Sequence, residues 1–226
     1  MINIKKQKSE MRKVLPHEHY FRFHLTLPKG YPEEMEDGWP MILFLHGAGE
    51  RGDDIERIMK HGIPKVVDEI DNFPFVTVSP QCPEDLWWPE LTDSLTVLLD
   101  HVIENYSIDQ KRVYLTGLSM GGYGTWHLSV KEPERFAAIA PVCGGGFPLN
   151  GFPQNLDRIV HVPVWVFHGE KDPLVPVKES RVLVDYLESH GGKVRFTVYP
   201  DAEHDAWTPT YSNPELYEWF MSNSLK

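Results

Sequence analysis

One serine stands between small residues where an expected strand meets an expected helix. Residues 117–121 read GLSMG, after an apolar, β-branched run at 113–116 and before a segment with helical spacing from 122 to about 130. In a G-x-S-x-G turn of this kind, neighbours without side chains let the strand and the helix approach closely while the serine hydroxyl stays exposed. The sequence therefore predicts Ser119 as a nucleophile that attacks a substrate carbonyl.

A serine hydroxyl becomes a strong nucleophile only when a general base, usually histidine, takes its proton. After a turn of this kind, the acid and the base follow the serine in the order Asp or Glu, then His. Of the 11 histidines, only His190 and His204 lie beyond the carboxylates that follow the turn. His190 is expected at a helix end, where histidine interacts with the last carbonyls, whereas His204 directly follows the last expected strand. We therefore predict His204 as the base.

The carboxylate that orients this histidine is expected in the loop after the strand at 164–167. Glu170 and Asp172 both lie in that loop. Asp172 is favoured because Pro173 restricts the backbone beside it, although an aspartate before proline is also common in ordinary turns. Taken together with the chain order, this predicts Asp172 as the acid.

Negative charge that develops on a carbonyl oxygen needs backbone N–H donors that are fixed in advance. One donor is expected from Met120, which follows the serine at the start of a helix. The other is expected from residues 46–52, which read HGAGERG after an apolar strand. Small residues there let backbone amides approach a substrate, so we predict Ala48 as the second donor and Gly47 as the next choice.

The same loop also matches the dinucleotide-binding pattern G-x-G-x-x-G through Gly47, Gly49 and Gly52. Asp53 and Asp54 follow directly, however, and their charges would face a pyrophosphate. The sequence has no H-E-x-x-H motif and no paired cysteines for a metal. We therefore expect neither a nucleotide cofactor nor a metal.

Apolar runs alternate with segments of helical spacing along most of the chain. The segment 21–27 alternates apolar and polar residues, as expected of a half-buried strand, whereas the continuous apolar run at 41–45 is typical of a strand buried on both faces. We predict further strands at 75–78, 113–116, 137–142, 164–167 and 194–198, and helices within 95–103, 122–130, 178–189 and 214–223. One or two short helices are expected within 55–67, broken around Gly62 and Pro64. This alternation predicts an α/β fold with a mostly parallel sheet, helices on both faces, and catalytic groups at the carboxyl ends of the strands.

The composition is that of an ordinary globular chain, with 41% hydrophobic and 24% charged residues. We expect a single domain over residues 1–226, with 1–18 as a loose, charged lead-in. The net charge of −11 argues against nucleic acid or an anionic membrane as a partner. Residues 1–13 do not resemble a secretory signal, and two cysteines, Cys82 and Cys143, form no disulfide framework. A cytoplasmic protein with reduced thiols is therefore expected, with a mature secreted form as the alternative, whereas the oligomeric state stays open.

Five segments together resemble small serine carboxylesterases of the α/β-hydrolase fold. They read HGAGERG at 46–52, SPQCP at 79–83, GLSMGG at 117–122, HGEKD at 168–172 and EHDAW at 203–207. The nearest group contains dienelactone hydrolases, acyl-protein thioesterases and feruloyl esterases, and some of its members are identified as predicted peptidases. The resemblance implies the roles already expected from the residues, with a triad and two oxyanion donors made by Ser119, Asp172, His204, Ala48 and Met120.

Apolar side chains are expected around this site, although each could instead anchor a loop on the core. They are Trp88, Phe147, Leu174 and Trp207. No insertion is long enough for a large lid, so we expect an open and shallow site that favours short-chain or aryl-acyl esters. The predicted activity is hydrolysis of a small-molecule ester through an acyl-enzyme, without a cofactor.

Two other functions remain open. A peptidase or amidase could use the same triad, although the chain has no room for the extra propeller domain that gates peptides in large peptidases of this fold. A binding protein could retain a degenerate hydrolase scaffold, although an intact serine, aspartate and histidine in the required order argues against it. True dienelactone hydrolases carry cysteine where this chain has Ser119, which argues against that activity.

Overall fold

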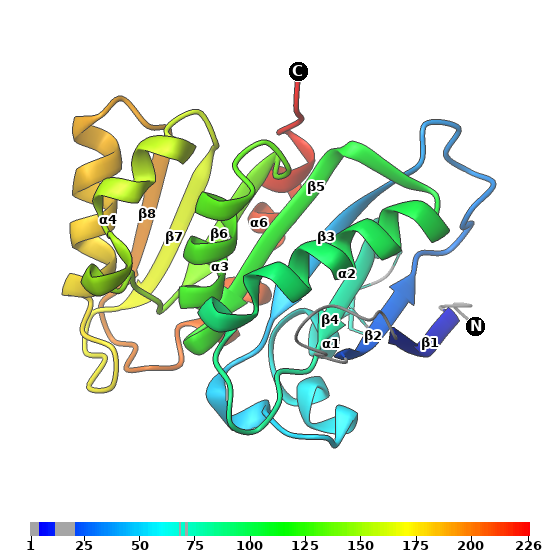
Figure 1. Cartoon of the computed structure of the whole chain (residues 1–226), viewed down its shortest axis with the longest axis horizontal. Coiled ribbons are helices and arrows are strands. Elements are labelled where there is room, and N and C mark those ends of the chain that lie inside the picture. The colour runs from blue at the N-terminus through cyan, green and yellow to red at the C-terminus, as the bar shows by residue number, and fades with distance from the viewer. Residues whose placement is uncertain (1–4, 12–20, 68, 71) are drawn as a thin grey trace.

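An eight-stranded sheet runs through the middle of the molecule (Figure 1). The structure, a computed structural model, describes residues 5–11, 21–67, 69–70 and 72–226. The strands are β1 (Lys5–Met11), β2 (Phe21–Leu27), β3 (Trp39–Leu45), β4 (Val76–Pro80), β5 (Ile108–Leu118), β6 (Ala138–Val142), β7 (Val164–Gly169) and β8 (Val194–Tyr199). Their order is β1-β2-β4-β3-β5-β6-β7-β8, and β3 to β8 are parallel, whereas β2 is antiparallel to both of its neighbours. The predicted mostly parallel sheet is confirmed.

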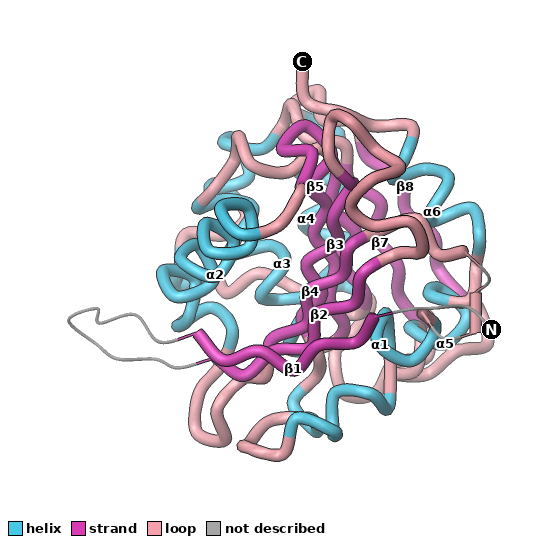
Figure 2. The backbone as a smooth tube through the Cα atoms, turned by 90° about the vertical axis from the view of Figure 1, so that its right-hand side faces the viewer, coloured by secondary structure: helices cyan, strands magenta, loops and turns pink. Residues whose placement is uncertain are grey.

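Helices cover both faces of this sheet (Figure 2). Side chains of α2 (Thr92–Asn105), α3 (Met120–Lys131) and α4 (Lys178–Ser189) pack in one hydrophobic cluster. The opposite cluster takes side chains of α1 (Gly62–Val66), α5 (Trp207–Tyr211) and α6 (Pro214–Met221). Short 3₁₀ turns complete the chain: η1 (Ala48–Glu50), η2 (Ile55–Lys60), η3 (Trp88–Leu91), η4 (Pro148–Asn150) and η5 (Gln154–Ile159).

Strand β3 shows how one apolar run serves both clusters. Met41, Leu43 and Leu45 belong to the cluster under α2 and α3, whereas Ile42 and Phe44 belong to the cluster under α1 and α6. Successive side chains of a strand point to opposite faces of the sheet. All seven residues of β3 are buried, so a polar side chain on either face would lose its contact with water. This burial accounts for the unbroken hydrophobic run.

The expected loose lead-in is wrong for residues 5–11. They form β1, which pairs antiparallel with β2 from Lys5 opposite Leu27 to Met11 opposite Phe21. A strand at the edge of a sheet is held by backbone hydrogen bonds, which do not depend on the side chain, so a charged segment can join. Residues 12–18 of the expected lead-in lie outside the described residues.

The other elements follow the prediction closely. Helix α4 has the predicted limits of 178 and 189. The break expected around Gly62 and Pro64 falls at His61, which separates η2 from α1. Helix α5 was not predicted, because five residues are too few to show helical periodicity. Within the part of the chain that is described, no helix has the length and the hydrophobicity needed to cross a lipid bilayer.

Candidate active site

Ser119 occupies the tight turn between β5 and α3. Its φ of 52° and ψ of −116° lie in a backbone region that residues other than glycine rarely adopt, so the turn is strained. Gly121 lies directly against strand β3, and a side chain there would run into the carbonyl group of Leu45. The glycine therefore allows the helix to start beside the sheet, and the serine is held at the carboxyl end of β5.

The structure brings Ser119 together with the predicted base and acid. His204 Nε2 lies 2.9 Å from Ser119 Oγ, and His204 Nδ1 lies 2.6 Å from Asp172 Oδ2. Asp172 follows β7, and His204 follows β8, so adjacent parallel strands deliver both side chains to the same end of the sheet. These three residues form a continuous hydrogen-bonded chain.

The competing candidates lie in other surroundings. His190 ends α4, where its ring stacks on Tyr186 at 4.0 Å and its Nδ1 lies 2.8 Å from the Tyr186 carbonyl oxygen. Glu170 forms an exposed ion pair with Arg181 at 2.9 Å. Neither side chain takes part in the chain of hydrogen bonds at the serine.

The carboxylate of Asp172 is fully enclosed and well supplied with donors. Its Oδ1 accepts hydrogen bonds from the backbone N–H groups of Leu174 and Val175, both at 2.9 Å. Burial raises the pKa of Asp172, but the hydrogen bonds from His204, Val175 and Leu174 outweigh burial and lower the pKa below its ordinary value. An ionised Asp172 accepts a hydrogen bond from the Nδ1–H of His204, which leaves the lone pair of Nε2 facing the serine hydroxyl.

The two expected oxyanion donors lie on either side of this turn. Met120 is the first residue of α3, so its N–H has no acceptor within the helix. Gly47 packs against the turn, since a side chain there would come within 2.8 Å of Leu118 Cδ1. Residues 46–52, which we call the oxyanion loop, therefore lie beside the serine. The roles of Met120, Ala48 and Gly47 as donors stay predictions.

His46 fixes the peptide that carries the Ala48 N–H. Its Nε2 accepts a hydrogen bond from the Cys82 N–H at 2.9 Å, so its proton lies on Nδ1, which donates to the Gly47 carbonyl oxygen at 2.6 Å. Burial lowers the pKa of His46 to about 4, and the ring is neutral. In a planar trans peptide the C=O and the N–H point in opposite directions. Because His46 holds the Gly47 carbonyl oxygen, the Ala48 N–H of the same peptide points away from the His46 ring.

The expectation that Trp88 contacts the substrate is wrong. Its side chain is fully buried, and its Nε1–H donates to the His46 carbonyl oxygen at 2.9 Å. The ring also packs on His46 at 5.0 Å and on Phe21 at 6.1 Å. Trp88 therefore supports the oxyanion loop from the core side.

The other expected pocket residues lie at the carboxyl ends of the strands, and their contact with substrate stays a prediction. Trp207 packs perpendicular to His204, with ring centroids 5.3 Å apart. Leu174, beside the acid, is 72% exposed. Phe147 stacks on Tyr123 at 4.7 Å.

Two further aromatic residues at this rim were not predicted. Tyr123 in α3 lies four residues, about one helical turn, after Ser119. This spacing could have placed Tyr123 beside the serine from the sequence. Trp87 is 39% exposed and lies 6.5 Å from Phe147. Nothing in the sequence distinguishes the outward Trp87 from the inward Trp88, because a loop has no periodicity that assigns faces.

Both cysteines are free and buried, as predicted. Burial raises the pKa of the Cys82 thiol to about 12 and that of the Cys143 thiol further. Neither is a thiolate near neutral pH. Among the described residues, no group of three or more His, Cys, Asp or Glu side chains is placed to hold a metal ion.

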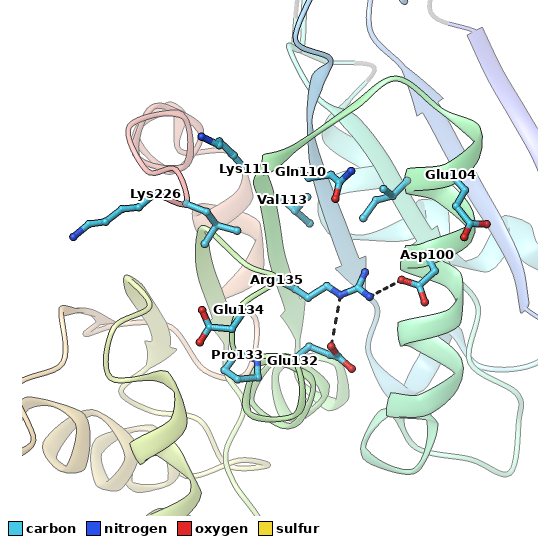
Figure 3. A pocket seen from close by; sticks show the side chains of 12 residues that line it. Asp100, Glu104, Gln110, Lys111, Val113, Glu132, Pro133, Glu134, Arg135 and Lys226 are labelled. Carbon is cyan, nitrogen blue, oxygen red and sulfur yellow. Dashed lines mark hydrogen bonds and ion pairs between the residues drawn. The ribbon is translucent and has the colours of Figure 1, made fainter.

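Two cavities lie at the other end of the sheet. One, of about 650 Å³, is bounded by the start of β5 and by residues 132–135, which follow α3 (Figure 3). Arg135 crosses it and pairs with Asp100 at 2.5 Å and with Glu132 at 3.6 Å. A second, of about 760 Å³, shares residues 225–226 with the first. Since α3 begins beside Ser119 and ends near these residues, neither cavity includes the serine.

Comparison with known proteins assigns the family. The sequence pattern of the phospholipase/carboxylesterase family matches residues 73–212, more than half of the chain. The chain belongs to this family. The assignment confirms the predicted class of enzyme, a carboxylic-ester hydrolase with the α/β-hydrolase fold.

Individual proteins agree with this assignment. The chain is 26% identical over 214 residues to a poly(3-hydroxyoctanoate) depolymerase of Pseudomonas fluorescens, covering 82% of this chain and 74% of that protein. It is 27% identical over 195 residues to a bifunctional acetylxylan esterase/xylanase of Neocallimastix patriciarum, covering 83% of this chain and 27% of that protein. A thermostable esterase of known structure has a TM-score of 0.84 and 34% identity, covering 97% of this chain and 63% of that one. The chain thus spans less than two thirds of the last two proteins.

Proposed function

We propose that this carboxylic-ester hydrolase works through an acyl-enzyme formed on Ser119. The observation that carries the proposal is the hydrogen-bonded chain from Ser119 Oγ through His204, at 2.9 Å, to Asp172, at 2.6 Å. Ser119 attacks the ester carbonyl while His204 Nε2 takes its proton and passes it to the leaving alcohol. Water then attacks the acyl-enzyme while His204 takes a proton from it, and His204 passes that proton to the Ser119 oxygen as the carboxylic acid is released. Asp172 holds the imidazole and stabilises its positive charge.

The charge of the tetrahedral intermediate falls on the former carbonyl oxygen. We assign its stabilisation to the N–H groups of Met120 and Ala48, with Gly47 as the alternative on the second side. The support for Met120 is its place at the start of α3, where the helix also contributes positive potential. The support for Ala48 is the fixed orientation of the Gly47 carbonyl.

The proposed substrates are small esters with a short or an aryl acyl group. A long acyl chain needs an enclosed apolar tunnel, in which each buried methylene contributes about 0.8 kcal/mol. The residues proposed to contact substrate, Trp207, Leu174 and Phe147, instead lie at a rim where Leu174 is 72% exposed. Binding should therefore stop improving after a few carbons, and kcat/KM should peak between acetyl and butyryl or with aryl acyl groups.

The test compares p-nitrophenyl esters of increasing acyl length, a feruloyl ester and a peptide anilide. The proposal expects turnover of short or aryl esters, a steep fall by the dodecanoyl ester, and little cleavage of the anilide. Faster cleavage of the anilide than of the esters would make the chain a peptidase. A rise in kcat/KM up to dodecanoyl would reveal a deep acyl pocket instead of a rim.

We further propose that the chain is a single cytoplasmic domain without a nucleic-acid or membrane partner. The continuous sheet supports one domain, the two free cysteines suit a reducing compartment, and the net charge of −11 disfavours polyanions. Cell fractionation, followed by alkylation of the denatured protein, should find the chain in the cytosol with both thiols reduced.

A further inference from the structure

A second histidine lies against the acid of the proposed triad. His168 is the last residue but one of strand β7, and its side chain is fully buried. Its Nε2 lies 3.3 Å from Asp172 Oδ2. The same Nε2 lies 2.8 Å from the carbonyl oxygen of Val175, and Nδ1 lies 2.8 Å from Ser180 Oγ. The hydrolysis scheme above gives this ring no part.

The partners of His168 determine where its proton lies. A carbonyl oxygen can only accept, so the Nε2 atom carries the hydrogen and donates it to Val175. Nδ1 is then an acceptor, and it faces the hydroxyl of Ser180 on α4. Burial lowers the pKa of His168, which agrees with a neutral ring that has one donor and one acceptor. Ser180 Oγ also lies 3.0 Å from the carbonyl oxygen of Gly144, so its one hydrogen is shared between this oxygen and Nδ1. The loop after β6 and strand β7 therefore meet at this hydroxyl.

His168 and Asp172 both bind the backbone of Val175, one at its carbonyl oxygen and the other at its N–H. The N–H of Val175 donates to Asp172 Oδ1 at 2.9 Å, and the carbonyl of Val175 accepts from His168 at 2.8 Å. The loop from 172 to 175, which we call the acid loop, is thereby folded back on its own first residue. With Oδ1 engaged by the loop, Oδ2 is left to face His204, at 2.6 Å.

We propose that His168 is a positioning residue that sets the direction of the Asp172 carboxylate toward His204, acting through the carbonyl of Val175 and its own contact with Oδ2. This inference rests on the proposed triad. Its consequence is that His168 affects the proton transfer at Ser119 without touching the substrate. Displacement of a catalytic group by about 1 Å can cost about 100-fold in rate, so loss of this support should lower kcat and leave KM nearly unchanged.

The test uses two replacements of similar length that differ in donor capacity. In His168→Met the N–H donor is lost, and we expect kcat to fall by about 10–100-fold with KM changed by less than about twofold. In His168→Gln the side-chain amide can still donate to Val175, so most of the lost kcat should return. His190→Met, the same replacement at an exposed helix end, is the control and should keep the kcat of the unaltered enzyme. Thermal unfolding of each variant shows that the fold is retained.

Three results would overturn the inference: an unchanged kcat in a folded His168→Met variant, a loss expressed mainly in KM, or a Gln variant as slow as the Met variant. If His168→Met does not fold, Ser180→Ala serves instead, because it removes only the hydroxyl that anchors Nδ1. A kcat equal to that of the unaltered enzyme in Ser180→Ala would then count against the proposal, and a several-fold fall at constant KM would support it. An active Ser119→Ala variant would overturn the proposed function itself, whereas an inactive Ser119→Ala beside a fully active His168→Met overturns only this inference.

Discussion

The same dipeptide, His-Gly, occurs beside two loops of this molecule and is used differently: the oxyanion loop begins with His46-Gly47, and His168-Gly169 ends strand β7, which leads into the acid loop. His46 donates to the carbonyl oxygen of the next residue, Gly47, at 2.6 Å, whereas His168 donates to the carbonyl oxygen of Val175 at 2.8 Å. The first histidine therefore fixes a single peptide plane, and the second fixes an entire loop. The oxyanion loop delivers a backbone N–H, for which one plane is enough. The acid loop delivers a side chain, which needs its whole backbone held.

Both rings are neutral, and burial is the reason. Burial lowers the pKa of His46 to about 4 and lowers the pKa of His168 as well. A neutral imidazole has one donor and one acceptor, and each ring has a partner for both. His46 accepts from the Cys82 N–H, and the acceptor of His168 faces the Ser180 hydroxyl. The two rings thus tie their loops to different elements, one to the end of β4 and the other to α4.

The largest effect should come from removing the serine that both loops are proposed to serve. Ser119→Ala should fold normally and lose on the order of 10⁴–10⁶ in kcat, because the members of a triad act as a unit. His204→Ala should be nearly as inactive, whereas His190→Ala, in the stacked position at the end of α4, should be nearly normal. Steady-state hydrolysis of a p-nitrophenyl ester measures all three. Inactivity of His190→Ala alone would mean that the base has been assigned to the wrong loop.

The next prediction concerns the oxyanion loop. His46→Leu removes the shorter of the two hydrogen bonds to the Gly47 carbonyl oxygen and leaves only that from the Glu50 N–H at 3.4 Å, so the Ala48 N–H can turn away more easily. Loss of one oxyanion donor costs about 10²–10³ in kcat, so we expect a fall of about 100-fold at nearly constant KM. His46→Asn keeps an N–H at the position of Nδ1 and should restore part of the rate. Equal rates for the Leu and Asn variants would show that the Gly47 carbonyl needs no donor from residue 46.

The neutral state of His46 also predicts how stability depends on pH. Between pH 6.5 and about 4 the unfolded chain binds a proton at this position that the folded chain does not, so stability falls as the pH falls. For a folded pKa of about 4, the loss between pH 7 and pH 5 is about 2 kcal/mol. Urea unfolding at both pH values should show this loss in the unaltered enzyme and a smaller loss in His46→Asn. The same loss in both proteins would contradict a buried, neutral His46.

The contacts of the two histidines, unlike the three residues of the proposed triad, could not be predicted from the sequence. Ser119, Asp172 and His204 could be proposed because a turn pattern and a chain order restrict the choice, and α4 could be delimited because its periodicity is clear. The proposed role of His46 depends on the Cys82 N–H, which comes from the loop after β4. The proposed role of His168 depends on the carbonyl oxygen of Val175 in the acid loop. Such contacts are products of the packing, and no spacing in the chain indicates them.

The two wrong expectations have related causes. Residues 5–11 join the sheet through their backbone, which composition does not reveal. Trp88 and Trp87 are neighbours in a loop, yet one is fully buried and the other is 39% exposed. A loop offers no period of two or of 3.6 residues that would assign them to faces. Only the hydrogen bond from Trp88 to His46 shows that the buried ring belongs to the oxyanion loop.

The smallest effect is expected from removing the hydrogen bond between Trp88 and the His46 carbonyl oxygen. This change should affect the oxyanion loop and leave the acid loop unaltered. Trp88→Phe keeps an aromatic ring in the core but leaves the buried His46 carbonyl without its donor, which should cost about 1–3 kcal/mol of stability. Because Trp88 touches the oxyanion loop and not the acid loop, kcat should fall only several-fold, with unchanged KM and unchanged acyl preference. Trp207→Phe is the matched comparison: this ring packs on His204 at 5.3 Å and is proposed to contact substrate, so the change should appear in KM. Guanidinium unfolding and the acyl-length series measure both variants. A shift of acyl preference in Trp88→Phe, with none in Trp207→Phe, would return Trp88 to the substrate pocket and remove its assignment as a support of the oxyanion loop.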